Sequence, residues 1–211
     1  MIRNRFMRDR LYNRRRILST SNKYQPGEFG YWWTVEEGNE DIEGEEYRGD
    51  INCTWKELIS LKGAPREVSG DFDCFHNQLT SLEGAPVHVS GDFDCSQNKL
   101  ISLVGAPKEV GGTFYCADNQ LDSLEGAPRE VGGRFVCSYN YLRSLKGAPE
   151  YVGGWFDCSN NRYLESLESA PEYVGREFFC DDCRNLSEED IMHLRDYCDI
   201  KGKIKSDYGE F

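Results

Sequence analysis

Hydrophobic positions recur along most of this chain with a period of 21 residues. A cysteine marks each period, with one final step of 22: Cys53, Cys74, Cys95, Cys116, Cys137, Cys158 and Cys180. Six of the seven prolines keep the same spacing: Pro65, Pro86, Pro107, Pro128, Pro149 and Pro171. Repetition at a period in the twenties is typical of a solenoid, in which each unit packs only on its neighbours. The pattern therefore predicts a stack of short coils.

Within one coil, the segment from Asp92 to Cys95 alternates polar and apolar residues, which predicts a short strand. Phe93 and Cys95 are then expected on its inner face. Gly91 allows the chain to turn into this strand, because glycine tolerates backbone conformations that other residues avoid. The outward positions of each strand are left to polar or variable residues.

The remainder of the coil predicts a bend and an extended return. Asn98 follows Cys95 by three residues, and a side-chain amide at this point can bond the backbone of the bend and link neighbouring coils. The same asparagine recurs along the chain: Asn77, Asn119, Asn140 and Asn161. Leu100 and Leu103 are expected to point inward. The Gly-Ala-Pro after them predicts a tight return with no room for a long helix.

The resulting spacing, Phe-x-Cys-x-x-Asn-x-Leu-x-x-Leu, covers roughly residues 47–186 and resembles the signature of the leucine-rich repeat family. The short unit is similar to the 21-residue bacterial and phage subtype, including uncharacterised repeat proteins of large tailed phages. The resemblance implies a leucine-rich-repeat solenoid of the α/β class, with a short parallel sheet on the concave face and a mostly irregular convex side. It implies no particular function, because such repeats host many unrelated binding roles.

Four segments are expected along the chain. They are a basic N-terminal arm (1–23), an N-terminal aromatic and acidic cap (24–46), a seven-coil array (47–186) and a C-terminal helical cap and tail (187–211).

Caps are expected because a stack of coils exposes apolar edges at its two ends. An aromatic cluster is predicted to cover the first coil: Tyr24, Phe29, Tyr31, Trp32 and Trp33. At the other end, Ser187 and the three acids after it predict a helix start. Ile191, Leu194 and Cys198 then form the apolar stripe of a docking helix.

Charge is distributed unevenly. The chain has a net charge of −12, yet residues 1–23 contain eight basic residues and one acid. Seven of the eight are arginines, which favour forked contacts to phosphate or carboxylate: Arg3, Arg5, Arg8, Arg10, Arg14, Arg15 and Arg16. We expect this arm to contact a polyanion such as nucleic acid, a membrane, a partner on which it folds, or the acidic body of the chain itself.

The nine cysteines are expected to be free thiols. A strictly periodic cysteine occupies the same inward site in every coil, where it acts as a small buried hydrophobe. The arginine-rich start does not resemble a signal peptide, and no stretch reaches transmembrane length. These features favour a cytoplasmic location, which is the host cytoplasm if the chain is phage-encoded.

Nothing in the sequence argues for catalysis or for a cofactor. Cys180 and Cys183 have a Cys-x-x-Cys spacing found in zinc and redox sites, but no second pair follows. Cys180 also belongs to the repeat, and Cys183 stands where the asparagine of the other coils would be. The three histidines have no nucleophile at a recognisable spacing. We therefore expect neither a metal site nor an enzyme.

The outward strand positions are the ones where the repeat changes. The early coils present aspartates, and the later ones present aromatic, apolar and basic residues. The candidate partner-binding residues are Asp71, Asp73, Asp92, Asp94, Tyr115, Arg134, Val136, Trp155, Asp157 and Phe179. Like charges on neighbouring strands repel, so we expect the aspartates to add nothing to stability. Exposed aromatic and arginine side chains are typical interface anchors.

Three functional classes are compatible with this pattern. The first is a non-catalytic adaptor or inhibitor that binds another protein through its concave strand face. The second is linked to nucleic acid, either through the arginine-rich arm or through an acidic body that mimics nucleic acid. The third is a structural component of a larger complex. The sequence leaves open the identity of the partner, the oligomeric state and whether the basic arm is ordered. It also leaves open whether the acidic face is a binding site or only keeps the chain soluble.

Overall fold

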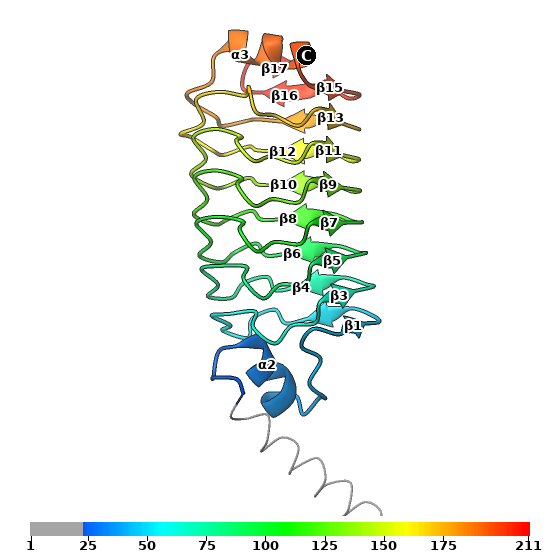
Figure 1. Cartoon of the computed structure of the whole chain (residues 1–211). Helices are drawn as coiled ribbons and strands as arrows, with labels where there is room; N and C mark the ends of the chain where they lie inside the picture. Colours follow the sequence, from blue (N-terminus) through cyan, green and yellow to red (C-terminus); the bar gives the residue numbers. More distant parts are fainter. Residues whose placement is uncertain (1–22) are drawn as a thin grey trace, which may run out of the picture.

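A computed structural model describes residues 23–211, which form a solenoid of stacked coils (Figure 1). The predicted stack of short repeating coils is therefore confirmed. The chain climbs along one axis from the N-terminal helices to the C-terminal strands (Figure 1). Each coil contributes two strands of two residues each over most of the stack, so helix is scarce.

The predicted strand of each coil belongs to a nine-stranded sheet. Its members are β2 (Ile51–Asn52), β4 (Phe72–Asp73), β6 (Phe93–Asp94), β8 (Phe114–Tyr115), β10 (Phe135–Val136), β12 (Phe156–Asp157), β14 (Phe178–Phe179), β16 (Ile204–Ser206) and β17 (Gly209–Glu210). All neighbours pair in parallel except β17, which pairs antiparallel with β16. The first residue of each repeat strand is buried, and consecutive Phe rings from β4 to β14 lie 5.0 to 5.6 Å apart.

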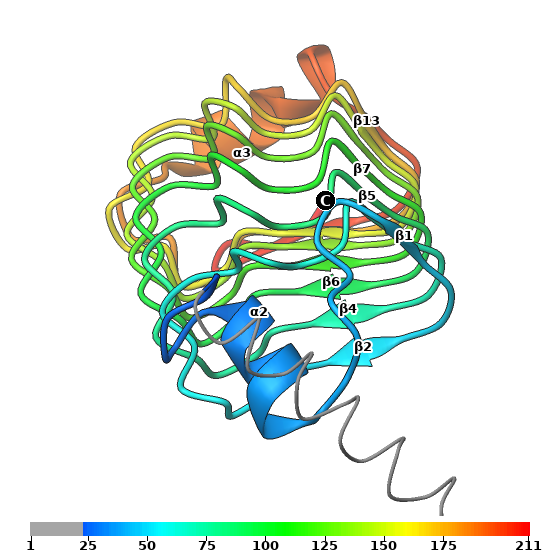
Figure 2. The same cartoon turned by 60° about the horizontal axis from the view of Figure 1, so that its bottom comes forward.

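A second, eight-stranded parallel sheet runs beside the first. Its members are β1 (Glu46–Tyr47), β3 (Glu67–Val68), β5 (His88–Val89), β7 (Glu109–Val110), β9 (Glu130–Val131), β11 (Tyr151–Val152), β13 (Tyr173–Val174) and β15 (Asp199–Ile200). Only three residues separate β3 from β4, so the two sheets meet at a corner (Figure 2). The expectation of one sheet and an otherwise mostly irregular surface was wrong here. A repeat strand of the second sheet, such as β5, has a single buried residue, Val89, and one inward position shows no alternation.

The corner between the sheets requires glycine because neighbouring coils approach closely. A Cβ atom on Gly112 would lie 2.2 Å from the Asp92 Oδ1 atom and 2.7 Å from the backbone of Gly91. A Cβ on Gly111 would lie 2.2 Å from the carbonyl oxygen of Ser90. Glycine therefore sets the spacing between coils at this corner.

The predicted asparagine ladder is confirmed. The Asn98 Oδ1 atom accepts the Leu79 N–H at 3.0 Å, and its Nδ2 donates to the carbonyls of Cys74 and Cys95 at 3.1 Å. The same three kinds of bond recur at the other ladder residues: Asn77, Asn119, Asn140 and Asn161. Each amide thus joins two coils in the buried interior.

The nine cysteines are free and buried, as predicted. Burial raises the pKa of the thiols in the repeat column: Cys53, Cys74, Cys95, Cys116, Cys137, Cys158 and Cys180. Cys183 takes the ladder position of asparagine, and its Sγ donates to the Cys158 carbonyl at 3.3 Å. A thiol therefore replaces one of the amide bonds in the last coil.

At the N-terminal end, α2 (Phe29–Tyr31) and the π-helix η1 (Trp32–Glu36) lie against the first coil. Tyr24, Phe29 and Trp32 are buried. The Phe29 ring lies 5.9 Å from Phe72, and the backbone N–H of Gly30 donates to the Lys62 carbonyl at 2.9 Å. Aromatic side chains thus cover apolar surface of the first coils.

At the C-terminal end, α3 (Glu188–Met192) begins at Ser187, which forms a capping box with Asp190. The 3-10 helix η2 (His193–Asp196) follows, and the predicted apolar stripe of Ile191, Leu194 and Cys198 is buried. The tail expected after the helix instead extends both sheets through β15, β16 and β17. Sequence analysis missed these strands because they follow no 21-residue spacing.

Candidate binding surface

The ten predicted binding residues lie together on the outward side of the nine-stranded sheet, here called the strand face. They occupy two columns, one at the second residue of each strand and one just before each strand. The first column contains Asn52, Asp73, Asp94, Tyr115, Val136, Asp157, Phe179 and Lys205 in register. The second contains Asp50, Asp71, Asp92, Thr113, Arg134, Trp155 and Glu177. The fold therefore brings the predicted residues onto one surface.

The aspartates of the second column each accept a backbone N–H from the next coil. Asp50 Oδ1 accepts from Asp71 at 3.0 Å, and Asp71 Oδ1 accepts from Asp92 at 2.7 Å. Asp92 Oδ1 accepts from Thr113 at 2.6 Å. Charge-assisted bonds of this kind stabilise a fold, so the expectation that these carboxylates add nothing to stability was wrong.

The aspartates of the first column bond within their own coil. Asp73, Asp94 and Asp157 each accept the N–H two residues later, at 3.0, 2.8 and 2.9 Å respectively. Burial raises the pKa of Asp73 and Asp94, and the neighbouring acids raise it further. The N-terminal half of the strand face is thus a crowded set of exposed and half-buried carboxylates, an environment that favours nearby cations.

The C-terminal half of the strand face carries a row of two aromatic rings with a basic group at each end. The Arg134 guanidinium lies 3.5 Å from the centroid of the Trp155 ring. Trp155 and Phe179 meet edge to face at 6.1 Å, and the Lys205 Nζ atom lies 5.2 Å from the Phe179 ring. This row runs from the coil of β10 to β16. Cation–aromatic contacts hold these side chains in place.

A further column, beside the strand face, was missed by the sequence analysis. Two residues after each repeat cysteine, a non-glycine residue has a positive φ between 52° and 60°: Trp55, His76, Gln97, Asp118, Tyr139, Asn160 and Asp182. Bulky residues rarely adopt this left-handed conformation. Trp55 and Tyr139 are nevertheless exposed by 63% and 61%. Their regular offset from the cysteines was the available sequence signal.

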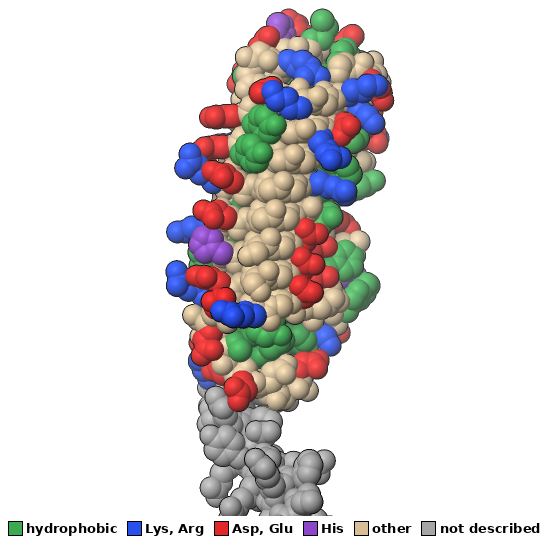
Figure 3. Space-filling model, turned by 90° about the vertical axis from the view of Figure 1, so that its right-hand side faces the viewer, with side chains coloured by type: hydrophobic (Ala, Val, Ile, Leu, Met, Phe, Trp, Pro, Cys, Tyr) green, Lys and Arg blue, Asp and Glu red, His purple; other side chains and the backbone are tan. Residues whose placement is uncertain are grey.

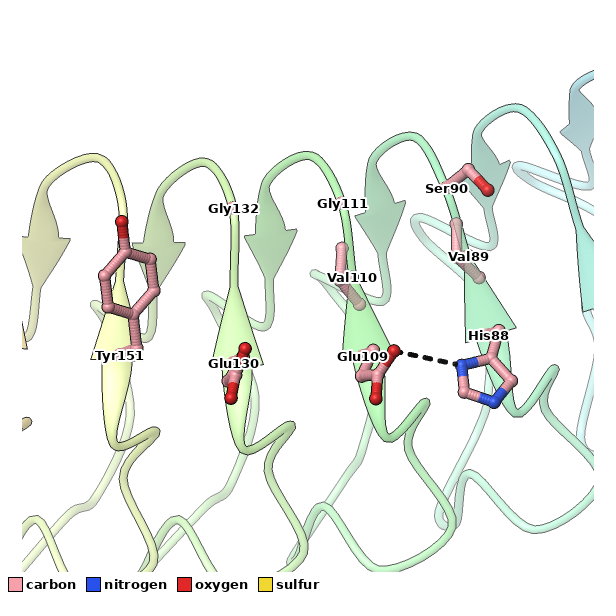
Figure 4. A pocket seen from close by; sticks show the side chains of 9 residues that line it. All are labelled: His88, Val89, Ser90, Glu109, Val110, Gly111, Glu130, Gly132 and Tyr151. Atoms are coloured by element: carbon pink, nitrogen blue, oxygen red, sulfur yellow. Dashed lines mark ion pairs between the residues drawn. The ribbon is translucent and has the colours of Figure 1, made fainter.

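The eight-stranded sheet carries a shallow groove (Figure 4). His88, Glu109, Glu130 and Tyr151 project from four successive strands, while Gly111 lies in the bend toward the other sheet (Figure 4). His88 Nδ1 lies 3.6 Å from the Glu109 Oε2 atom. A band without charged or hydrophobic side chains runs along the stack between two columns of mostly charged residues (Figure 3).

The predicted polyanion-binding arginines of the arm, at positions 3–16, lie outside the described residues. Lys23, which ends the arm, is described. Its Nζ atom lies 2.8 Å from both Asp41 and Glu43, and the hydrogen bonds to these carboxylates raise its pKa. The one described residue of the arm is therefore engaged by acids of the chain itself.

Within residues 23–211, no group of three or more His, Cys, Asp or Glu side chains is placed to hold a metal ion. None of the helices in this described region is long and apolar enough to cross a membrane. Searches of protein-family models, curated proteins and solved structures found no match to this chain.

Proposed function

We propose that this chain is a non-catalytic protein-binding module that uses its strand face. The observation that carries the proposal is the contrast between the two sides of the nine-stranded sheet. Behind the sheet, the buried position is Phe in six consecutive repeat strands, from Phe72 to Phe178. In front of it, the residue changes from Asp94 to Tyr115 and Val136 in successive strands. Stability alone would have allowed one repeated outward residue.

The two halves of the strand face suit different parts of a partner. The carboxylates of the N-terminal half attract basic groups, and their charge steers association. The row that begins with Arg134 and Trp155 supplies the residue types that most often dominate binding energy. A partner with a basic segment followed by an apolar or aromatic patch would match the strand face.

The finer reading follows the resemblance to short leucine-rich repeats. We propose a phage-encoded adaptor or inhibitor that acts in the host cytoplasm, with the segments at the two ends of the stack serving as caps. The periodic buried thiols support a reducing compartment, because disulfides do not persist there.

The test is affinity purification from the native host with the full chain as bait, followed by mass spectrometry. The variant is Tyr115→Ala with Trp155→Ala, which removes two aromatic side chains of the strand face. The matched control is Tyr151→Ala with Tyr173→Ala, which removes a stacked pair from the other sheet, where the rings lie 4.8 Å apart. We expect the first variant to lose the partner and the control to keep it. Equal recovery by both folded variants would contradict the proposal.

Salt separates this proposal from the nucleic-acid alternative. An acidic body that mimics nucleic acid would lose its partner steeply between low and high salt, because exposed charges are screened. In the described part of the chain, the second candidate is favoured by the carboxylates of the N-terminal half, from Asp71 to Asp94; the arginines of the arm, its other basis, lie outside the described residues. Binding that survives 0.5 M salt in the parent and is lost in the Tyr115/Trp155 variant would favour the protein-binding class. The third candidate, a component of a larger complex, would appear as co-purification with several constant partners.

A further inference from the structure

Three aromatic rings meet at the N-terminal end of the stack, beside the acidic half of the strand face. Trp55 stacks on His76 with ring centroids 3.3 Å apart. Phe75 meets Trp55 edge to face at 6.2 Å and 67°. Trp55 is nevertheless 63% exposed, so most of its ring remains open to solvent. The cluster of Trp55, Phe75 and His76, with its exposed indole, is here called the aromatic corner.

The aromatic corner breaks the repeat at two adjacent positions. Phe75 stands in a column whose other members are Thr54, Ser96, Ala117, Ser138, Ser159 and Asp181. Trp55 stands in the left-handed column, where most of the other members are polar. Ser96, Ser138 and Ser159 show that a small side chain satisfies the fold at the position of Phe75. The two exceptions fall in consecutive coils and contact each other, which indicates that they belong to one site.

The backbone of Trp55 adds a second argument. Its φ is 58°, a conformation that favours asparagine or glycine and disfavours a large ring. Asn160 occupies the same position five coils later. The conformation recurs in every coil and belongs to the repeat, so it is the large ring at Trp55 that departs from what the backbone favours. A tryptophan at this position is thus unfavourable for the stability of the fold, while its exposed indole is accessible to a ligand.

Charge around the aromatic corner indicates the kind of ligand. Asp73 accepts the Phe75 N–H at 3.0 Å, so its carboxylate adjoins the corner, and Asp71 precedes it on the same face. The basic neighbour Lys56 is already engaged, because its Nζ atom lies 3.2 Å from Glu37 and over the Trp32 ring. In the described part of the chain, no Lys or Arg lies over the rings of Trp55 or Phe75.

We propose that Trp55, Phe75 and Asp73 form a subsite for the ammonium group of a lysine side chain, or its N-methylated form, on a protein partner. Aromatic faces attract cations through the ring quadrupole, and the adjoining carboxylate adds charge attraction. A compact ammonium can approach the exposed part of the Trp55 indole, whereas a planar guanidinium prefers a flat stack such as Arg134 on Trp155. This subsite deepens the proposed function, on which it rests, because Asp73 belongs to the strand face.

The experiment uses the full chain labelled with 15N and follows the indole N–H signals of its tryptophans by NMR. Three short peptides serve as probes, identical except at one position. That position is lysine, trimethyl-lysine, or a neutral isostere in which carbon replaces the quaternary nitrogen. We expect the Trp55 signal to move with the two charged peptides and to stay in place with the neutral one.

Two variants remove the aromatic corner without removing a buried side chain of the core. Phe75→Ser restores the serine of other coils, and Trp55→Asn restores the residue of the sixth coil. The matched control is Tyr139→Asn, which changes an exposed aromatic residue in the same left-handed column. We expect the Trp55 and Phe75 variants to weaken binding of the trimethyl-lysine peptide by about five- to thirty-fold, and the control to leave it unchanged. Circular dichroism confirms that each variant is folded.

Three outcomes would overturn the subsite. They are equal binding of the neutral isostere, loss of binding in the Tyr139 control, and no movement of the Trp55 signal with any peptide. The Tyr115/Trp155 variant keeps the two failures apart. If it loses the host partner while no peptide moves the Trp55 signal, binding through the strand face is supported and the lysine subsite is refuted. If peptides bind at Trp55 but the Tyr115/Trp155 variant still recovers the host partner, binding through the strand face is refuted instead.

Discussion

The carboxylate of Asp92 accepts a hydrogen bond from the backbone N–H of Thr113 at 2.6 Å, and this bond joins two neighbouring coils. The same relationship links Asp50 to Asp71 and Asp71 to Asp92. A row of like charges on adjacent strands therefore persists because each charge has a local donor. The acidic half of the strand face is built into the fold and is also available to a partner.

Replacing Asp92 by alanine is expected to destabilise the fold by about 1 to 2 kcal/mol, because the Thr113 N–H loses a charged acceptor. Asp92→Asn keeps an acceptor oxygen and is expected to lose less. Urea unfolding followed by circular dichroism measures both. If both variants were as stable as the parent, the bond at 2.6 Å would contribute nothing to the free energy of unfolding.

Replacing Asn119 by alanine is expected to have a larger effect, roughly 3 kcal/mol or more. Its amide serves the Leu100 N–H and the carbonyls of Cys95 and Cys116, all in the buried interior. In the alanine variant, this N–H and these two carbonyls would be left without a hydrogen bond and without access to water. The exposed neighbour Gln120 supplies the control, since Gln120→Ala should change the unfolding midpoint little. A similar midpoint for the two variants would contradict the ladder's role.

Asp94→Asn is expected to stabilise the protein at pH 7 and to lose this advantage as the pH falls. Burial, followed by the charges of Asp73 and Asp92, raises the pKa of the Asp94 carboxyl in the folded state. A raised folded pKa means that folding favours the protonated form, so the ionised parent is less stable above that pKa. Below the unfolded pKa, the parent is protonated and matches the neutral variant. Unfolding of the two proteins at pH 7, 5.5 and 4 measures the difference, and a constant difference would contradict the assignment.

The thiols are expected to resist modification in the folded protein. The nine cysteines are buried, and burial raises the pKa of the repeat thiols such as Cys95 and Cys116, so little reactive thiolate forms at neutral pH. Titration with a disulfide reagent should count few thiols in the native state and nine after denaturation. Rapid reaction of several thiols without unfolding would contradict this placement.

Much of the fold could be predicted because its cause is periodic. The strand that carries Phe93 and Cys95 and the ladder amide of Asn98 follow from spacing alone, because each coil presents the same inward sites. The second sheet could not be predicted in this way. Its strand in that coil, His88–Val89, buries only Val89 and so shows no alternation; it is defined by bonds to neighbouring coils.

The sequence predicted which residues belong to the candidate site, but it did not predict the contacts that they make. Alternation placed Asp92, Arg134 and Trp155 outward, and the structure agrees. The bond from Thr113 to Asp92 could not be foreseen, because it depends on the corner geometry that brings one coil close to the next. The aromatic corner was missed for a similar reason, since a positive φ at Trp55 leaves no mark in a hydropathy pattern.

The constant register of the ladder has a consequence for how such chains can change in length. In the regular coils, the bonds that ladder amides, second-column carboxylates and thiols make to another coil reach only the adjacent coil, 19 to 24 residues away. Deleting one whole unit, such as residues 98–118, would remove one strand from each sheet and leave the bonds of the flanking units able to form again. The acidic half and the row at Trp155 would then move closer by about 4.8 Å, one strand spacing. The number of coils therefore sets the distance between the acidic half and the row at Trp155, in steps of one strand spacing.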